Sequence, residues 1–240
     1  MHARITLRRF SVKYPAFTLE PLSLEFKAGE RVAIVGPNGS GKTTTLRALA
    51  GRLTEYEGSI LFDGQELRGL LPLGRRKIGL LPETLGGYGW MTVREHLAFL
   101  RDFYPSWDPE YAAHLTDRLR VPTDQLLGRL SKGTRVKVAF VAAEAYRPPL
   151  LLLDEPTSGL DPEVRGELLD TVRASVDAQP DRVVILSTHL LEDVELIADR
   201  VLLLQNGRLG LNTSVAELRE SHENASVAKT LYAAISRARS

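Results

Sequence analysis

The chain has 240 residues, of which 43% are hydrophobic and 25% charged, a composition typical of a globular protein with one large or lobed domain. Its 31 basic and 30 acidic residues leave a formal net charge of +1, which argues against nucleic-acid or membrane-surface binding through charge alone. The absence of cysteine excludes disulfides, thiolate metal sites and a cysteine nucleophile. No segment has the apolar length of a signal-peptide core or a transmembrane helix, so we expect a chain that is soluble by itself.

The first part of the chain is predicted to form strands around one helix. Alternating apolar residues between positions 4 and 26 indicate a half-buried antiparallel sheet, and the continuous apolar run Val32–Val35 indicates a strand covered on both faces. A glycine-rich turn follows, and then a helix from about Gly41 to Ala50. Two short strands are expected at Gly58–Asp63 and Arg76–Leu81.

Between residues 91 and 147 the apolar pattern becomes helical. Thr92 and Glu95 form a capping-box sequence, which is typical of a helix start. Asp108 followed by Pro109 indicates a second helix start, and Ser131 is a candidate N-cap for a third helix. We interpret this block as a helical lobe inserted into a core that contains the sheet.

Strands and helices then alternate. Leu150–Leu153 is predicted to be a buried strand, and a helix is expected after Asp161 and Pro162. Val183–Ser187 and Val201–Leu204 are predicted as further buried strands, with a helix between them at about 192–198. Alternating strands and helices with buried strands indicate an α/β fold with a doubly wound, mainly parallel sheet.

The C-terminal part has weaker signals. Asn206 and Gly207 form a good two-residue hairpin turn, and Ser214 to Glu217 is predicted to open a short helix. We assign residues 1–220 to one domain and treat 221–240 as a tail with a helical apolar spacing. Whether this tail packs on the core, contacts a partner or frays is open.

The strongest local signal is the segment from Gly36 to Thr43, which matches the pattern G-x-x-x-x-G-K-S/T. Glycines let backbone N–H groups turn towards phosphate oxygens, and the following helix N-terminus adds partial positive charge. Lys42 can reach the β- and γ-phosphates, and the Thr43 hydroxyl can hold Mg²⁺. The residues predicted to surround the phosphates are Gly36, Pro37, Asn38, Gly39, Ser40, Gly41, Lys42, Thr43 and Thr44.

Two acidic residues end the strand Leu150–Leu153. Asp154 is placed to orient Mg²⁺ through its water shell, and Glu155 is a candidate general base for an attacking water. A strand that ends in two solvated acids is common on its own. The combination with a phosphate loop is what favours a nucleotide hydrolase.

Many ATPases and GTPases share these two elements, and further segments narrow the choice. The segments are Tyr14, Leu80–Glu83, Leu130–Thr134, Ser158–Asp161 and Ser187–His189. In their order and spacing, over about residues 4–215, they resemble the nucleotide-binding subunit of ATP-binding cassette (ABC) transporters. The resemblance implies a P-loop NTPase core with a mainly parallel sheet, an N-terminal antiparallel β subdomain and an inserted α-helical lobe.

The resemblance also implies roles for single residues. Tyr14 matches the aromatic residue that stacks on adenine, although stacking alone does not exclude GTP. His189 matches the switch histidine that contacts the γ-phosphate. Ser131 and Gly133 match residues that bind the γ-phosphate of ATP held by the other subunit, so that two subunits enclose two ATP molecules head to tail. Asp161 resembles the acidic residue that crosses this interface.

Two positions depart from the family pattern. The usual signature Leu-Ser-Gly-Gly-Gln reads LSKGT here, with Lys132 in place of a glycine. We expect Lys132 to point to solvent, and the alternative is that it adds positive charge near the partner's phosphate. Glu83 stands where most members have glutamine, and we expect it to be a tolerant ligand on the metal side. The sequence around and after Glu83 resembles exporter-type two-component systems of bacteria.

The resemblance implies an ATP-binding and ATP-hydrolysing subunit that uses Mg²⁺. Its expected partners are a second ATPase subunit, identical or related, and a separately encoded transmembrane permease subunit, with no nucleic acid. The expected location is cytoplasmic, at the inner face of the cell membrane through the permease, and the expected direction is export. Two alternatives are an ABC-type ATPase of soluble cofactor assembly and a regulatory nucleotide-binding module with low turnover.

Overall fold

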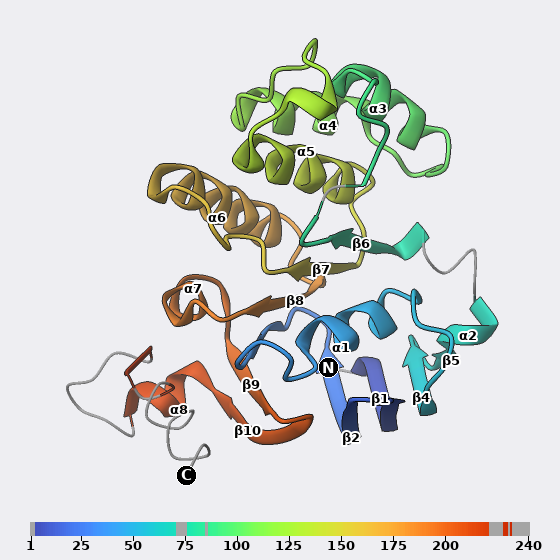
Figure 1. Cartoon of the computed structure of the whole chain (residues 1–240), viewed down its shortest axis with the longest axis vertical. Helices are drawn as coiled ribbons and strands as arrows, with labels where there is room; N and C mark the ends of the chain where they lie inside the picture. The colour runs from blue at the N-terminus through green and yellow to red at the C-terminus, as the bar shows by residue number, and fades with distance from the viewer. Residues whose placement is uncertain (1–2, 71–75, 85, 221–227, 230, 232–240) are drawn as a thin grey trace.

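A computed structural model describes residues 3–70, 76–84, 86–220, 228, 229 and 231, and its strands form two sheets (Figure 1). The first sheet is antiparallel, with four strands in the order β2-β1-β4-β5. Its strands are β1 (Ala3–Tyr14), β2 (Phe17–Lys27), β4 (Glu57–Phe62) and β5 (Gln65–Glu66). The predicted N-terminal antiparallel sheet is therefore confirmed.

The second sheet has six strands in the order β10-β9-β3-β8-β7-β6. All neighbours in it are parallel except β10, which forms an antiparallel hairpin with β9. Its strands are β3 (Arg31–Val35), β6 (Ile78–Leu81), β7 (Leu150–Asp154), β8 (Val183–Thr188), β9 (Arg200–Gln205) and β10 (Arg208–Ser214). The hairpin turns at Asn206 and Gly207, both of which have positive φ as a tight primed turn requires.

The helices begin close to the predicted residues. They are α1 (Lys42–Leu49), α2 (Leu67–Leu70), α3 (Val93–Arg101), α4 (Pro109–Arg118), α5 (Lys132–Glu144), α6 (Pro162–Asp177), α7 (Leu191–Ile197) and α8 (Val215–Glu220), and the 3-10 helix η2 spans Leu127–Arg129. Thr92, Asp108 and Ser131 each accept a hydrogen bond from a backbone N–H of the helix that they cap. Asp161 occupies the N-cap position of α6, but its side chain makes no capping hydrogen bond.

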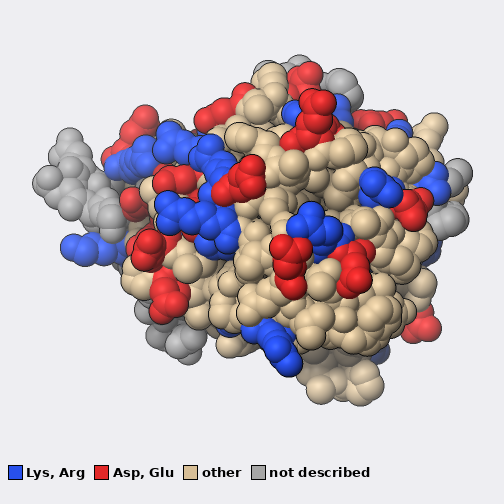
Figure 2. Space-filling view, turned by 90° about the horizontal axis from the view of Figure 1, so that it is seen from above, with Lys and Arg blue, Asp and Glu red and all other residues tan. Residues whose placement is uncertain are grey.

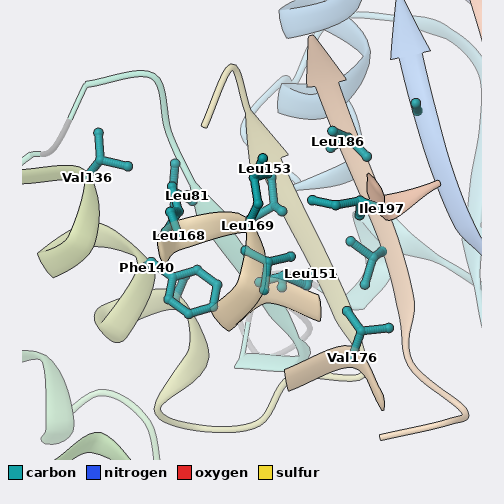
Figure 3. Packing of buried hydrophobic residues seen from close by; sticks show 14 of the residues in the cluster. Leu81, Val136, Phe140, Leu151, Leu153, Leu168, Leu169, Val176, Leu186 and Ile197 are labelled. Carbon is teal, nitrogen blue, oxygen red and sulfur yellow. The ribbon is translucent and has the colours of Figure 1, made fainter. Parts of the chain in front are cut away.

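Alternate residues of the parallel strands face two separate cores. On β3, Val32 and Ile34 pack with α1 and the antiparallel sheet, whereas Ala33 and Val35 pack with α5, α6 and α7. Figure 3 shows part of this second core, with Phe140 of α5, Leu151 and Leu153 of β7, and Leu168 and Leu169 of α6. Because both faces are covered, these strands read as continuous apolar runs in the sequence.

The helices α3, α4 and α5 lie together beyond the β6 edge of the parallel sheet, at the end of the molecule opposite the antiparallel sheet (Figure 1). A buried polar cluster joins this helical group to the sheet. Arg182, just before β8, donates to Glu144 of α5 at 2.5 Å and to the Pro148 carbonyl at 2.9 Å. The Tyr111 hydroxyl of α4 donates to the same Glu144 oxygen at 3.0 Å, and burial together with this carboxylate raises the pKa of Tyr111.

Only part of the tail lies within the described residues. Ala228, Lys229 and Leu231 are helical, and Ala228 and Leu231 are buried in the core that contains α7 and α8. Ala228 and Leu231 therefore pack on the core, and apart from the exposed Lys229 the other tail residues lie outside the described part of the chain. On the face shown in Figure 2, basic and acidic side chains are mixed rather than gathered by sign. Among the described residues, no helix combines the length and the apolar character needed to cross a bilayer.

Candidate nucleotide-binding site

The phosphate loop leaves the C-terminal end of β3 and enters α1, as its sequence predicts. Gly36 has a φ of 153°, and a Cβ atom there would lie 2.1 Å from the Leu204 carbonyl oxygen, so only glycine fits. Gly39 has a φ of 77°, and a Cβ atom there would meet no atom within 4 Å. The loop is thus packed tightly against β9 at its start and is open at its tip.

Lys42 lies under the loop with its side chain almost completely buried. Its Nζ donates to the carbonyl oxygens of Gly36 and Pro37 at 2.9 and 3.3 Å. The same Nζ lies 3.3 Å from Glu155 Oε1, so the lysine joins the loop to the acidic end of β7. This places a fixed positive charge next to the carboxylate that the sequence suggests as the general base.

Asp154 is the centre of a hydroxyl cluster beside the loop. Thr43 Oγ1 donates to Asp154 Oδ1 at 3.0 Å, and Ser187 Oγ donates to the same oxygen at 2.7 Å. The Ser187 hydroxyl also accepts from the backbone N–H of Glu155 at 3.1 Å. Sequence reasoning gave no role to Ser187, although a hydroxyl among the last residues of a fully buried strand was a visible signal.

Glu155 contacts the predicted switch histidine directly. Its Oε2 lies 2.7 Å from His189 Nδ1, while its Oε1 faces Lys42. The backbone of Glu155 has a φ of 50°, a left-handed conformation that is uncommon for a residue with a side chain and that clusters at functional sites. The carboxylate is therefore held between two nitrogen groups, at the mouth of the phosphate loop.

These residues surround a cavity of about 570 Å³. It is lined by Tyr14, Ala16, Phe17, Asn38, Gly39, Ser40, Gly41, Lys42, Thr43, Thr44, Glu83, Glu155, Ser158 and His189. Tyr14 is 41% exposed and stacks on Phe17 with ring centroids 6.4 Å apart, so an aromatic pair stands at one side of the cavity. Most of the residues predicted to bind nucleotide are thus brought together.

Six of the predicted residues do not line this cavity. Gly36, Pro37 and Asp154 are hydrogen-bonded to Lys42 or Thr43, which do line it. The other three are Ser131, Gly133 and Asp161. Ser131 and Gly133 lie at the N-terminus of α5, and Asp161 precedes α6. Lys132 is exposed, as expected, but its Nζ lies beside Gly159 rather than extending freely, since a Cβ atom on Gly159 would be 2.7 Å from it. The short segment after Glu155 and the start of α5 are therefore neighbours on one surface.

The residues present fit a nucleoside triphosphate with Mg²⁺. Ser40 Oγ is buried and has no hydrogen-bond partner among the described residues, which suits it to bind a phosphate oxygen or the metal's water shell. The Thr43 hydroxyl and the Asp154 carboxylate supply the hard oxygen ligands that Mg²⁺ prefers. Glu83 lines the cavity and also a smaller hollow that includes Asp154. Glu83 therefore lies on the same side of the cavity as Asp154. Fold and site together define a P-loop nucleotide-binding protein.

Comparisons with known proteins narrow this class. A family model described as ABC transporter matches residues 19–158. The chain is 34% identical over 204 residues to the ABC transporter ATP-binding protein YtrB of Bacillus subtilis, covering 85% of this chain and 69% of YtrB. It is 35% identical over 214 residues to the SkfA peptide export ATP-binding protein SkfE of Bacillus subtilis, covering 85% of this chain and 86% of SkfE.

The sulfate/thiosulfate import ATP-binding protein CysA of Caulobacter vibrioides is 36% identical over 224 residues, covering 90% of this chain and 65% of CysA. A solved structure described as the ATP binding subunit of an ABC transporter superimposes with a TM-score of 0.83 at 29% identity, covering 96% of this chain and 98% of the other. The chain belongs to the ABC transporter family as an ATP-binding subunit, and it is an ATPase. The predicted P-loop core with its mixed α/β architecture is confirmed.

Proposed function

We propose that two such subunits close head to tail on two ATP molecules and so drive a separately encoded transmembrane subunit, in the direction of export. The observation that carries this proposal is the division of the site. Glu155, Lys42 and His189 meet at the phosphate loop, whereas Ser131 and Gly133 lie outside its cavity. A second subunit that presents its own Ser131 and Gly133 would complete the shell around the γ-phosphate.

In this mechanism Glu155 accepts a proton from the attacking water. Lys42 neutralises charge that develops on the transferred phosphate, and His189 holds the γ-phosphate beside Glu155. Mg²⁺, held by Thr43 and by Asp154 through water, would add positive charge at the β- and γ-phosphates. The hydrogen bonds from Thr43 and Ser187 orient the Asp154 carboxylate for that task.

The start of α5 suits contact with a partner's phosphate. The Ser131 side chain caps the helix by accepting from the Thr134 N–H, and the other N–H groups of the first turn have no partner within the helix. The helix dipole adds partial positive charge at the same end, which favours an anion. Asp161, exposed before α6, is the proposed contact of the subunit interface.

An exposed aromatic surface supports docking to a transmembrane subunit. Tyr88, Trp90, Phe99 and Phe103 are 41–68% exposed and contact one another edge-to-face or stacked. Apolar clusters of this kind on a surface mark interaction sites. We therefore place the permease on this surface, with the ATPase at the inner face of the membrane.

We further propose that residues 1–220 form the ATPase domain, with 91–147 as its helical lobe.

The direction of export is supported by the sequence that follows Glu83 and by the similarity to SkfE, whose name states peptide export. CysA, which is as similar, is named for import. Transport of a labelled peptide substrate by vesicles that contain the permease would distinguish the two directions. Only movement of the peptide away from the side of the membrane that carries the ATPase agrees with the proposal.

The variant Glu155→Gln tests the mechanism and the dimer together. It removes the base but keeps the shape of the side chain, so ATP should bind while kcat falls about 10²- to 10⁴-fold. Dimers should accumulate in ATP, as measured by size-exclusion chromatography with light scattering. Asp170→Asn is the matched control. It removes one acidic charge at an exposed position of α6 and should behave as wild type. Turnover of Glu155→Gln at the wild-type rate would exclude Glu155 as the base.

A further inference from the structure

Asp193 carries a buried carboxylate that lies outside the nucleotide cavity. The residue is 0% exposed, on the first turn of α7. Its Oδ2 accepts a hydrogen bond from the Thr157 hydroxyl, and its Oδ1 lies 2.6 Å from Nη2 and 2.8 Å from Nε of Arg165. A buried carboxylate is unfavourable unless such partners compensate it, and here both oxygens are used.

Asp193 and its two partners belong to three segments that converge on the site. Thr157 is two residues after Glu155, and Asp193 is four residues after His189. Arg165 lies in α6, one turn after Asp161. Its backbone N–H donates a hydrogen bond to the Asp161 carbonyl oxygen. Glu155 and His189 also contact each other directly at 2.7 Å. The segment that carries Glu155 and the segment that carries His189 are therefore joined twice, by the contact between these two residues and by the hydrogen bond from Thr157 to Asp193.

This second link explains how the backbone of Glu155 is held. Its left-handed conformation persists only where the surroundings constrain it from several sides. The Glu155 N–H donates to the Ser187 carbonyl at 3.1 Å, which restrains the segment on the β8 side. The Thr157 hydroxyl restrains the other side, and Thr157 is 1% exposed, so water does not compete for this hydrogen bond.

We propose that Asp193 is a positioning residue for ATP hydrolysis, which sets the placement of Glu155 against His189 and links both to the segment that carries Asp161. Asp193 does not line the cavity and so acts through these residues rather than on ATP. The inference rests on the proposed roles of Glu155 and His189. It extends them by assigning the Thr157–Asp193–Arg165 cluster a part in catalysis.

The pair Thr157→Val and Thr157→Ser tests the link. Valine keeps the shape of threonine and removes the hydroxyl, whereas serine keeps the hydroxyl. Misplacement of catalytic groups by about 1 Å can cost about 10²-fold in rate, so Thr157→Val should lower kcat about 10- to 100-fold. The KM for ATP should stay within about twofold, because the cavity lining is unchanged. Thr157→Ser should retain most of the wild-type kcat.

A spectroscopic measurement separates positioning from simple loss of stability. The imidazole ¹⁵N signals of His189 report the contact with Glu155, and they should shift in Thr157→Val but not in Thr157→Ser. Asp193→Asn, which removes the charge that faces Arg165, should change kcat and these signals in the same direction as Thr157→Val. Should Asp193→Asn fail to fold, the threonine pair still decides the question.

The failure of this proposal is distinguishable from failure of the proposed function. A wild-type kcat in Thr157→Val, beside a Glu155→Gln variant that has lost turnover, would overturn the positioning role alone. Equal losses in Thr157→Val and Thr157→Ser that follow their melting temperatures, with unchanged His189 signals, would also overturn it. Normal turnover in Glu155→Gln would instead remove the assumption on which the inference rests.

Discussion

Replacing Arg182 with methionine removes the cation that faces Glu144 in the interior of the protein. Both side chains are 0% exposed, and Glu144 Oε2 has no hydrogen-bond partner in the described part of the chain. The variant would leave the carboxylate buried with the Tyr111 hydroxyl as its remaining donor. Breaking a buried ion pair on one side costs about 3–5 kcal/mol, and a chain of this length loses about 2 °C of melting temperature per kcal/mol. We expect Arg182→Met to melt about 6–10 °C below wild type.

Thermal unfolding followed by circular dichroism measures this loss. The double variant Arg182→Met/Glu144→Leu is the matched comparison, because it removes both charges and leaves apolar side chains of similar size. It should lose only about 1 kcal/mol each for the Pro148 carbonyl and the Tyr111 hydroxyl that lose their partners, and so melt about 4 °C below wild type, above the single variant. A single variant that melts within about 2 °C of wild type, or a double variant as unstable as the single one, would refute the reasoning.

Three further predictions follow from the site and its surroundings. Gly36→Ala should abolish ATP binding in a fluorescent-nucleotide assay, since its Cβ would lie 2.1 Å from the Leu204 carbonyl oxygen; binding at wild-type affinity would contradict the loop geometry. Glu83→Gln should keep substantial ATPase activity, and complete loss would show that this position is not a tolerant metal-side ligand. Burial lowers the pKa of His96 below its ordinary value of 6.5, so the unfolded state takes up the proton first and stability falls as the pH drops below about 6.5. The urea midpoint of His96→Asn should therefore decline less between pH 7.5 and 5.5 than that of wild type, and an equal decline would exclude His96 as a cause.

The features that the sequence predicts well are those whose causes lie within a few residues. The capping box of Thr92 and Glu95 is made by neighbours three positions apart, and both of its hydrogen bonds are present. The turn at Asn206 and Gly207 follows from the backbone freedom of those two residues. The phosphate loop is equally local, because Lys42 bonds to the carbonyl of Gly36, which lies six residues before it.

Contacts that join distant segments could not be predicted from the residue pattern. No motif marks Arg182 in the sequence. Its side chain is nevertheless completely buried against Glu144, which lies 38 residues away. Asp193 lies in a helix with two other acids, and only the fold shows that it faces Thr157 and not solvent. The orientation of Lys132 towards Gly159 was likewise open. Such pairings depend on which surfaces the packed helices and strands present to each other.

The order of residues alone indicated the family, the strands that carry the phosphate loop and the acids, and the roles that we propose for Lys42 and Glu155, because those features follow from local spacing and residue type. Only the tertiary structure decided that Glu155 lies between Lys42 and His189, and that Ser131 and Gly133 lie apart from the cavity. The physical reason is that the order of strands in a parallel sheet sets which loop ends meet at its edge. Residues 42, 155 and 189 become neighbours because β8 pairs with both β3 and β7.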